Sequence, residues 1–208
     1  MPRRSNRQIS RSGIRSRSVE VREPAQKILV VCEGEKTETQ YFRQFPVVPK
    51  DSVEVRGVEK DPLRLVQKAR EFAREYHSRT GYSYGQVWCV FDRDEHERFR
   101  QALQLAAQNK FCVAYSNPAF EIWYLLHFGY SDRPMTPQEC CYALSDRLGC
   151  PYEKNQPWYS RLQGFQTAAV IHADRLLSRY DQPDPANDNP STTVHLLVLE
   201  LNKHLRQR

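Results

Sequence analysis

The chain has 208 residues and a formal net charge of +6, and 39% of its residues are hydrophobic, which is typical of one domain with a hydrophobic core. No apolar run is long enough to cross a bilayer, and the Arg/Ser-rich start contains no hydrophobic signal region. We therefore exclude a membrane protein and expect a soluble protein of the cytoplasm.

The positive charge is concentrated at the start of the chain. Residues 1–22 contain seven arginines and one acidic residue, a charge of +6 that equals the net charge of the whole chain. Because residues 1–24 have almost no large apolar side chains, we expect them to form a disordered arm. Such an arm can bind the phosphate backbone of a nucleic acid by counterion release, or it can be a solvated tail that only aids solubility.

Apolar segments and helical patterns alternate through residues 25–130, which we interpret as the core domain. The expected strands are residues 27–32, 53–58, 86–91 and 111–115. The expected helices are residues 37–45, a helix that begins at Asp61-Pro62, and residues 96–109. Strand 53–58 alternates and is expected at an edge, whereas 27–32 and 86–91 are apolar throughout, as in strands that are covered on both faces. This order predicts a three-layer α/β fold with a mostly parallel sheet.

From Asn117 onward the pattern is mainly helical. We expect a buried helix over 118–128 and further helices over 136–149, 160–181 and 191–207. Residues 182–190 are rich in Pro, Asp and Asn and are expected to be a linker. We interpret residues 131–208 as a helical C-terminal extension that packs on the core.

Two predicted buried strands run directly into carboxylates. Strand 27–32 is followed by Glu33, and strand 86–91 is followed by Asp92 and Asp94 in a D-x-D pattern. Because the carboxyl ends of parallel strands meet at one edge of a sheet, we expect these acids to share a crevice. Carboxylates suit Mg²⁺, for which Mn²⁺ can substitute, so the sequence predicts a metal-dependent phosphoryl-transfer or hydrolysis site. Taken singly, each of these acids is more often simply solvated.

Four further residues near these strand ends are candidates for substrate binding. Lys36 can neutralise a phosphate, and Arg93 can hold a nucleic-acid backbone. His96 can assist proton transfer, and Asn117 follows strand 111–115 at the same sheet edge. The alternative for Lys36 and His96 is a solvated side chain.

Glu121 lies in an otherwise apolar helix, where a carboxylate is costly unless it is paired or binds a metal. It is either an acid of the site or half of an internal ion pair with an arginine, and we favour the site. His127 in the same helix is expected to be a hydrogen-bonded structural histidine.

Other kinds of site find little support. Cys140, Cys141 and Cys150 could bind zinc, but the sequence has neither C-x-x-C nor paired histidines near them. Phosphate-binding loops, the G-x-S-x-G elbow and H-E-x-x-H are also absent from the sequence.

Four ordered motifs give the chain a resemblance to the RloB-like family. They are CEGEKTE at 32–38 with Tyr41-Phe42, VFDRD at 90–94, SNPAFEIW at 116–123 with 125–128, and NPSTTV at 189–194. The resemblance spans about residues 27–200. It implies a Toprim/Rossmann-like fold, similar to the Toprim domains of topoisomerases, primases and OLD-type nucleases.

In that resemblance Glu33 takes the role of the invariant acid, and Asp92 and Asp94 form the D-x-D that binds Mg²⁺. The resemblance also draws Asn117, Glu121 and His127 toward the site. It further implies a part in prokaryotic defence against phages.

The first hypothesis is a Mg²⁺-dependent nuclease that hydrolyses or transesterifies phosphodiester bonds of RNA, tRNA included, or of DNA. Glu33, Asp92 and Asp94 would hold the metal, Glu121 would assist catalysis, and Trp158-Tyr159 could stack on unpaired bases. The second hypothesis is a non-catalytic metal-binding or sensor subunit that acts with a partner ATPase, since the chain has no NTPase motif. The third is nucleotidyl or pyrophosphate chemistry on a small nucleotide, although the missing glycine-rich loop counts against it.

Overall fold

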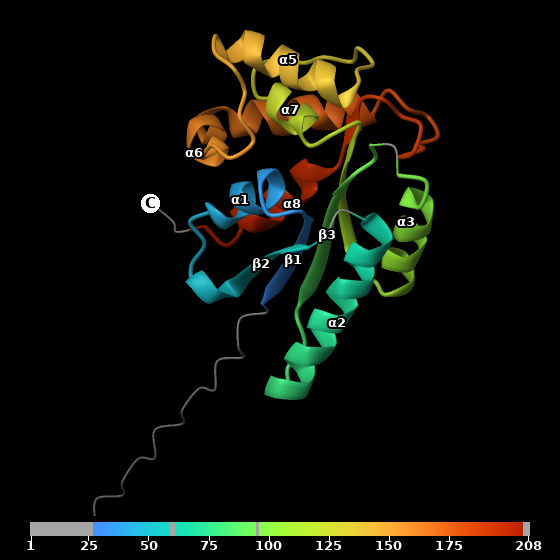
Figure 1. The fold of residues 1–208 in the computed structure, drawn as a ribbon. Helices are drawn as coiled ribbons and strands as arrows, with labels where there is room; N and C mark the ends of the chain where they lie inside the picture. The colour runs from blue at the N-terminus through green and yellow to red at the C-terminus, as the bar shows by residue number, and fades with distance from the viewer. Residues whose placement is uncertain (1–26, 59–60, 95, 206–208) are drawn as a thin grey trace, which may run out of the picture.

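The computed structural model describes residues 27–58, 61–94 and 96–205, and within them the chain folds around one five-stranded sheet (Figure 1). The strands are β1 (Ile28–Glu33), β2 (Val53–Val58), β3 (Gln86–Asp92), β4 (Cys112–Asn117) and β5 (Ser191–Thr192). Their order across the sheet is β2-β1-β3-β4-β5, and only β5 is antiparallel to its neighbour. The predicted α/β fold with a mostly parallel sheet and an edge strand at 53–58 is confirmed. The predicted arm, residues 1–24, lies outside the described residues.

Helices follow the strands along the described part of the chain. The α-helices are α1 (Thr37–Arg43), α2 (Pro62–Thr80), α3 (Phe99–Gln108), α4 (Glu121–Leu125), α5 (Pro137–Leu148), α6 (Trp158–Leu162), α7 (Gln166–Leu177) and α8 (Val194–Asn202), with 3₁₀ turns η1 (Lys50–Ser52) and η2 (Gln163–Phe165). Asp61 caps α2 by accepting a hydrogen bond from the main chain of Arg64, as its position before Pro62 predicts. No helix in the described ranges is both long and apolar enough to span a membrane.

Both faces of the sheet are covered, which explains why β1 is apolar without alternation. Ile28, Val30 and Cys32 pack into a core with α1 and the helices from α4 to α8. Leu29 and Val31 point to the other face, where α2 and α3 cover the sheet. Figure 1 shows α2 and α3 on one side of the sheet and α1 and α8 on the other. The fold is therefore three-layered, and its carboxyl-end loops are left to build a site.

The C-terminal region differs from the prediction at two places. The single helix expected over 160–181 is divided by η2 into α6 and α7, at a segment that contains Gly164. The helix expected over 191–207 begins only at α8, because residues 191–192 form β5. The Thr192 hydroxyl donates a hydrogen bond to Tyr115 O (3.0 Å). Ser191 and Thr192 thereby pair with β4 and provide hydrogen-bond partners for its outer edge.

Two aromatic residues of α6 also differ from the prediction. Trp158 and Tyr159, expected to be available for stacking on bases, are 2% and 6% exposed and belong to the core. The buried helix expected over 118–128 is limited to α4, but its side chains are buried as predicted.

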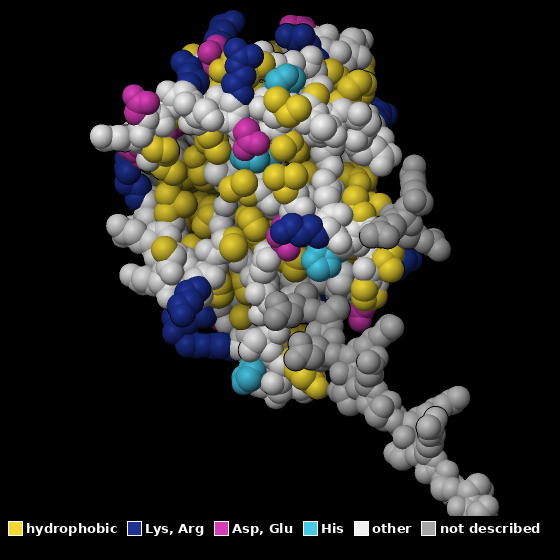
Figure 2. Space-filling model, turned by 180° about the vertical axis from the view of Figure 1, so that it is seen from behind, with side chains coloured by type: hydrophobic (Ala, Val, Ile, Leu, Met, Phe, Trp, Pro, Cys, Tyr) yellow, Lys and Arg dark blue, Asp and Glu magenta, His cyan; other side chains and the backbone are white. Residues whose placement is uncertain are grey.

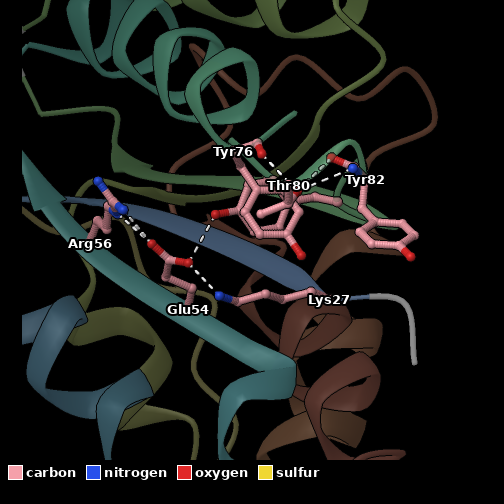
Figure 3. A network of polar contacts seen from close by, with 7 residues as sticks. Lys27, Glu54, Arg56, Tyr76, Thr80 and Tyr82 are labelled. Carbon is pink, nitrogen blue, oxygen red and sulfur yellow. Dashed lines mark hydrogen bonds and ion pairs between the residues drawn. The ribbon is translucent and has the colours of Figure 1, made fainter. Parts of the chain in front are cut away.

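A polar network ties the amino ends of the edge strand and its neighbours together (Figure 3). Glu54 of β2 accepts hydrogen bonds from Lys27 (2.6 Å), Arg56 (2.6 Å) and the Tyr84 hydroxyl (2.9 Å). Burial alone would raise the pKa of Glu54, but these three donors outweigh it and lower the pKa to about 2. Because this network lies at the amino ends of the strands, we assign it to fold stability rather than to the site.

Candidate functional site: a buried acidic cluster and an adjoining groove

Four carboxylates from four different elements gather near the carboxyl ends of β1 and β3. They are Glu33 at the end of β1, Glu38 in the first turn of α1, Asp92 at the end of β3 and Glu121 at the start of α4. Glu33 is 8% exposed, Glu38 is 7% exposed and Glu121 is 1% exposed. The main-chain N–H of Asp92 donates to Glu33 Oε2 over 3.4 Å, which links the two strand ends directly. We call these four residues the acidic cluster.

Burial and mutual repulsion disfavour the ionised form of this cluster. Burial is the main cause that raises the pKa of Glu38 from 4.5 to about 8, and the charges of Glu121 and Glu33 raise it further. The pKa of Asp92 is also raised well above its usual range by burial and by Glu38, Glu121 and Glu33. Asp92 Oδ1 is buried without a hydrogen-bond partner in the described part of the chain. Buried carboxylates that repel one another in this way bind protons or cations strongly.

A tight turn after β1 places the first two acids. Gly34 has φ of +74°, a left-handed conformation that glycine adopts at little cost, and its N–H donates to Val58 O over 2.7 Å. Its carbonyl accepts a hydrogen bond from Thr39 Oγ1 (2.7 Å), which fixes the start of α1. On the neighbouring strand, a Cβ on Gly57 would lie 2.5 Å from the Gly34 oxygen, so only glycine fits there. The turn is thereby held against β2.

Glu121 has two partners from the C-terminal extension. Tyr152 donates its hydroxyl to Glu121 Oε1 over 3.0 Å, and Lys154 Nζ lies 3.3 Å from the same oxygen. Burial lowers the pKa of Lys154, but the charge of Glu121 more than offsets this and leaves the pKa raised. The predicted ion pair of Glu121 is thus present, and its cation is a lysine rather than an arginine, while its role as a site acid stays a prediction.

His96 joins the acidic cluster from the loop before α3. Its Nε2 lies 3.1 Å from Glu33 Oε1, and its side chain is 27% exposed. One nitrogen of the imidazole thus contacts a cluster acid while the ring remains open to solvent. By contrast, His127 is buried, with Nδ1 2.9 Å from Trp123 O, and burial lowers its pKa to about 4. His127 is placed as the structural histidine that the sequence predicts.

The other candidate residues lie beside the acidic cluster rather than in it. Asp92 is the last residue of β3, and Asp94 is exposed, with φ of +31°. Asp94, Arg93 and Asn117 line an open groove of about 290 Å³ at the carboxyl ends of β3 and β4. Lys36 is exposed at the start of α1. The candidate residues from the sequence thus fall into two groups, those in the acidic cluster and those in the groove, while Lys36 is exposed near the cluster.

Two of the groove residues, Arg93 and Asn117, also hold the segment 182–190. Arg93 Nε donates to Ala186 O (2.8 Å) and its Nη1 donates to Asp94 O (2.6 Å). Asn117 Nδ2 donates to Pro185 O over 3.2 Å. These contacts make the segment a wall of the groove.

Sequence reasoning missed three residues of the acidic cluster and its surroundings: Glu38, Tyr152 and Lys154. A signal for Glu38 exists, because Glu38, Tyr41, Phe42 and Phe45 follow the i, i+3, i+4, i+7 pattern of one helix face, and the three aromatic residues are buried. Tyr152 and Lys154 lie in a loop whose approach to Glu121 is set by tertiary packing. No local pattern marks them.

The acidic cluster has the chemistry of a site for a hard divalent cation, although its side chains do not form a closed cage. In the arrangement shown, the described residues contain no group of three His, Cys, Asp or Glu side chains that could hold a metal ion. The donors are nevertheless carboxylate oxygens, the kind that Mg²⁺ and Mn²⁺ prefer. The unpartnered Asp92 Oδ1 and the raised pKa values of Asp92 and Glu38 fit a cation that would neutralise the cluster. Glu33, Asp92, Glu38 and Glu121 are the residues that would hold it.

Comparison with known families gives one match. The family described as RloB-like protein matches residues 28–201, which is most of the chain. No curated protein and no solved structure matches the chain. The resemblance to the RloB-like family that the four motifs indicate is thus confirmed.

Proposed function

The chain belongs to the RloB-like family, and from that premise and the acidic cluster we propose that it is a Mg²⁺-dependent nuclease. It would hydrolyse or transesterify phosphodiester bonds of RNA, tRNA included, or of DNA, in prokaryotic defence against phages. The observation that carries the proposal is the burial of Glu33, Glu38 and Glu121 with the Asp92 carboxylate at the strand ends. Buried like charges destabilise a fold, so a cation-dependent role explains them better than a structural one.

A bound Mg²⁺, or Mn²⁺ in its place, would supply positive charge to the phosphoryl oxygens as the phosphorus is attacked. The chain's own residues do the rest. Glu33, Asp92 and Glu38 present carboxylate oxygens, and Tyr152 and Lys154 orient Glu121 by binding its Oε1.

His96 is placed to hold or move a proton. Its Nε2 contacts Glu33 Oε1, so the carboxylate orients the ring, and its partial exposure leaves it accessible from solvent. An imidazole ring can both donate and accept a proton, which makes His96 suited to deliver a proton to a leaving oxygen or to take one from the attacking group.

Positive charge for the nucleic-acid backbone would come from outside the acidic cluster. Lys36 is exposed next to the turn after β1. Arg93 lies in the groove that adjoins the acidic cluster. The seven arginines of residues 1–22 would add a salt-dependent attraction to phosphates.

The test is cleavage of labelled tRNA, single-stranded DNA and duplex DNA with Mg²⁺, with Mn²⁺ and with EDTA. We expect cleavage that needs the metal and falls at least about 100-fold in Asp92→Ala and Glu33→Gln. Glu35→Gln is the matched control, because Glu35 is in the same turn but is exposed and pairs with Arg43. Cleavage that survives in folded Asp92→Ala and Glu33→Gln would refute the proposed site.

A second candidate is a non-catalytic subunit that works with a partner such as an ATPase. It is favoured by exposed apolar side chains on α7 and α8, where Ile171 is 60% exposed and Leu196 and Leu199 are each 43% exposed. Figure 2 shows hydrophobic side chains over a broad area of the face that is turned away in Figure 1. Monomeric proteins seldom expose large apolar areas. Cleavage that appears only with a partner protein present would support this candidate.

A further inference from the structure

The groove beside the acidic cluster has walls from four parts of the chain that are separated in sequence. Arg93 and Asp94 follow β3, Asn117 and Pro118 lie at the end of β4, and residues 135–137, 186, 187 and 189 complete the lining. It measures about 290 Å³ and is open to solvent. Because Arg93 and Asp94 directly follow Asp92, the last residue of β3, the groove and the acidic cluster adjoin at the carboxyl end of the sheet.

The wall formed by residues 182–190 is fixed in place, although the sequence suggested only a linker. The Asn189 side chain accepts from Met135 N (3.1 Å) and donates to Met135 O (2.8 Å). Arg100 pairs with Asp184 over 2.7 Å, and Asp184 also accepts from Asn187 Nδ2 (2.8 Å). The groove is therefore preformed, which lowers the entropic cost of binding a ligand.

The lining combines apolar side chains with polar groups. Met135, Pro118 and Pro137 supply apolar contact, while Asn187 supplies an amide at the exposed rim. Arg93 supplies a guanidinium, and its Nη2 has no hydrogen-bond partner among the described residues. A nucleobase has apolar faces and polar edges and is followed by a phosphate, so it matches each of these features.

We propose that this groove binds one unpaired nucleotide of a single strand, next to the phosphodiester that lies at the acidic cluster. The inference rests on the proposed nuclease function and names its substrate as single-stranded nucleic acid. A base inside a duplex is stacked on both faces and paired along one edge, so it reaches such a recess only after it leaves the stack. RNA and DNA strands share this chemistry, and the experiment distinguishes them.

The experiment measures binding rather than cleavage, so that it is independent of the proposed catalysis. Fluorescently labelled single-stranded RNA, single-stranded DNA and duplex DNA of equal length are titrated with the full chain in EDTA, and anisotropy is recorded. Asn187→Trp fills the groove at an exposed position with one side-chain hydrogen bond to lose. Gln163→Trp is the matched control, since it too is exposed and makes one side-chain hydrogen bond, in η2.

We expect wild type to bind at least one single strand more tightly than the duplex. Asn187→Trp should weaken that binding about tenfold, as expected for the loss of a base contact, whereas Gln163→Trp should bind like wild type. A mixture of nucleoside 5′-monophosphates should compete with the strand in wild type and less so in Asn187→Trp. Whichever strand, RNA or DNA, shows the larger loss in Asn187→Trp is the one that the groove accepts.

Three results would overturn the inference: equal affinity of folded Asn187→Trp and wild type, tighter binding of duplex than of either single strand, or no binding of any probe by wild type. The failure of the proposed function looks different, because it appears as cleavage that does not depend on Glu33 and Asp92. Groove-dependent binding without cleavage would sustain this inference while refuting the nuclease.

Discussion

Replacing Glu38 with Gln should stabilise the metal-free protein, and the gain should grow with pH. In the folded chain Glu38 keeps its proton up to about pH 8, because burial and the neighbouring acids raise its pKa, whereas its ordinary value is 4.5. The folded state therefore binds more protons than the unfolded state between these values, and stability must fall as pH rises through that window. Gln cannot ionise, so the variant escapes this loss.

The size of the effect follows from the pKa difference. One pKa unit corresponds to about 1.4 kcal/mol, so the loss from Glu38 amounts to ~1 kcal/mol at pH 5 and ~3 kcal/mol at pH 7. The stability difference between Glu38→Gln and wild type should thus widen by ~2 kcal/mol from pH 5 to pH 7. For a chain of this size that corresponds to a difference in melting temperature of roughly 4–8 °C.

The assay is thermal and urea unfolding in EDTA at several pH values between 5 and 8. Glu75→Gln, an exposed position on α2, is the control and should show the same pH dependence as wild type. Adding Mg²⁺ at pH 7 should stabilise wild type more than Glu38→Gln, because a bound cation would favour the Glu38 carboxylate over its protonated form and Gln supplies no carboxylate. Curves for wild type and Glu38→Gln that run parallel from pH 5 to pH 8 would refute the electrostatic description of the acidic cluster.

Three further changes test the supports of the site. Lys154→Met removes the cation on Glu121 and should cost about 1 kcal/mol in EDTA, a loss that Mg²⁺ restores in thermal unfolding. Gly57→Ala places a Cβ 2.5 Å from the Gly34 oxygen and should cost about 1–3 kcal/mol in urea unfolding, with weaker stabilisation by Mg²⁺ because the turn after β1 shifts. Asn189→Ala removes two hydrogen bonds to the loop before α5, so we expect a loss of about 1–3 kcal/mol and faster amide hydrogen exchange in that loop.

The parallel core of the fold could be predicted because its signals are local. The central strand β1 is apolar from Ile28 to Cys32, whereas the edge strand 53–58 alternates, so the residue pattern alone distinguishes a central strand from an edge strand. β5 has only two residues, and its strand character depends on hydrogen bonds to β4, which no local pattern reveals.

The site was predictable to the extent that it lies at strand ends. Glu33 and Asp92 end neighbouring parallel strands, so sheet geometry brings them together. The D-x-D pattern suggested that Asp94 joins them, but β3 ends at Asp92, and the left-handed conformation of Asp94 places its exposed side chain in the groove. A two-residue period holds only while the strand continues.

The adjoining positions of acidic cluster and groove also constrain what a substrate must look like. A nucleotide bound in the proposed groove would contact Arg93 and Asp94, and because these residues directly follow Asp92, its phosphate would lie near the acidic cluster. The ion pair between Glu121 and Lys154 likewise links the C-terminal extension to the acidic cluster. Residues 25–130 alone therefore complete neither the groove nor the surroundings of Glu121. Since residues after 130 supply Lys154, Tyr152 and the segment 182–190, the extension is part of the site, and its loss should abolish both strand binding and cation-induced stabilisation.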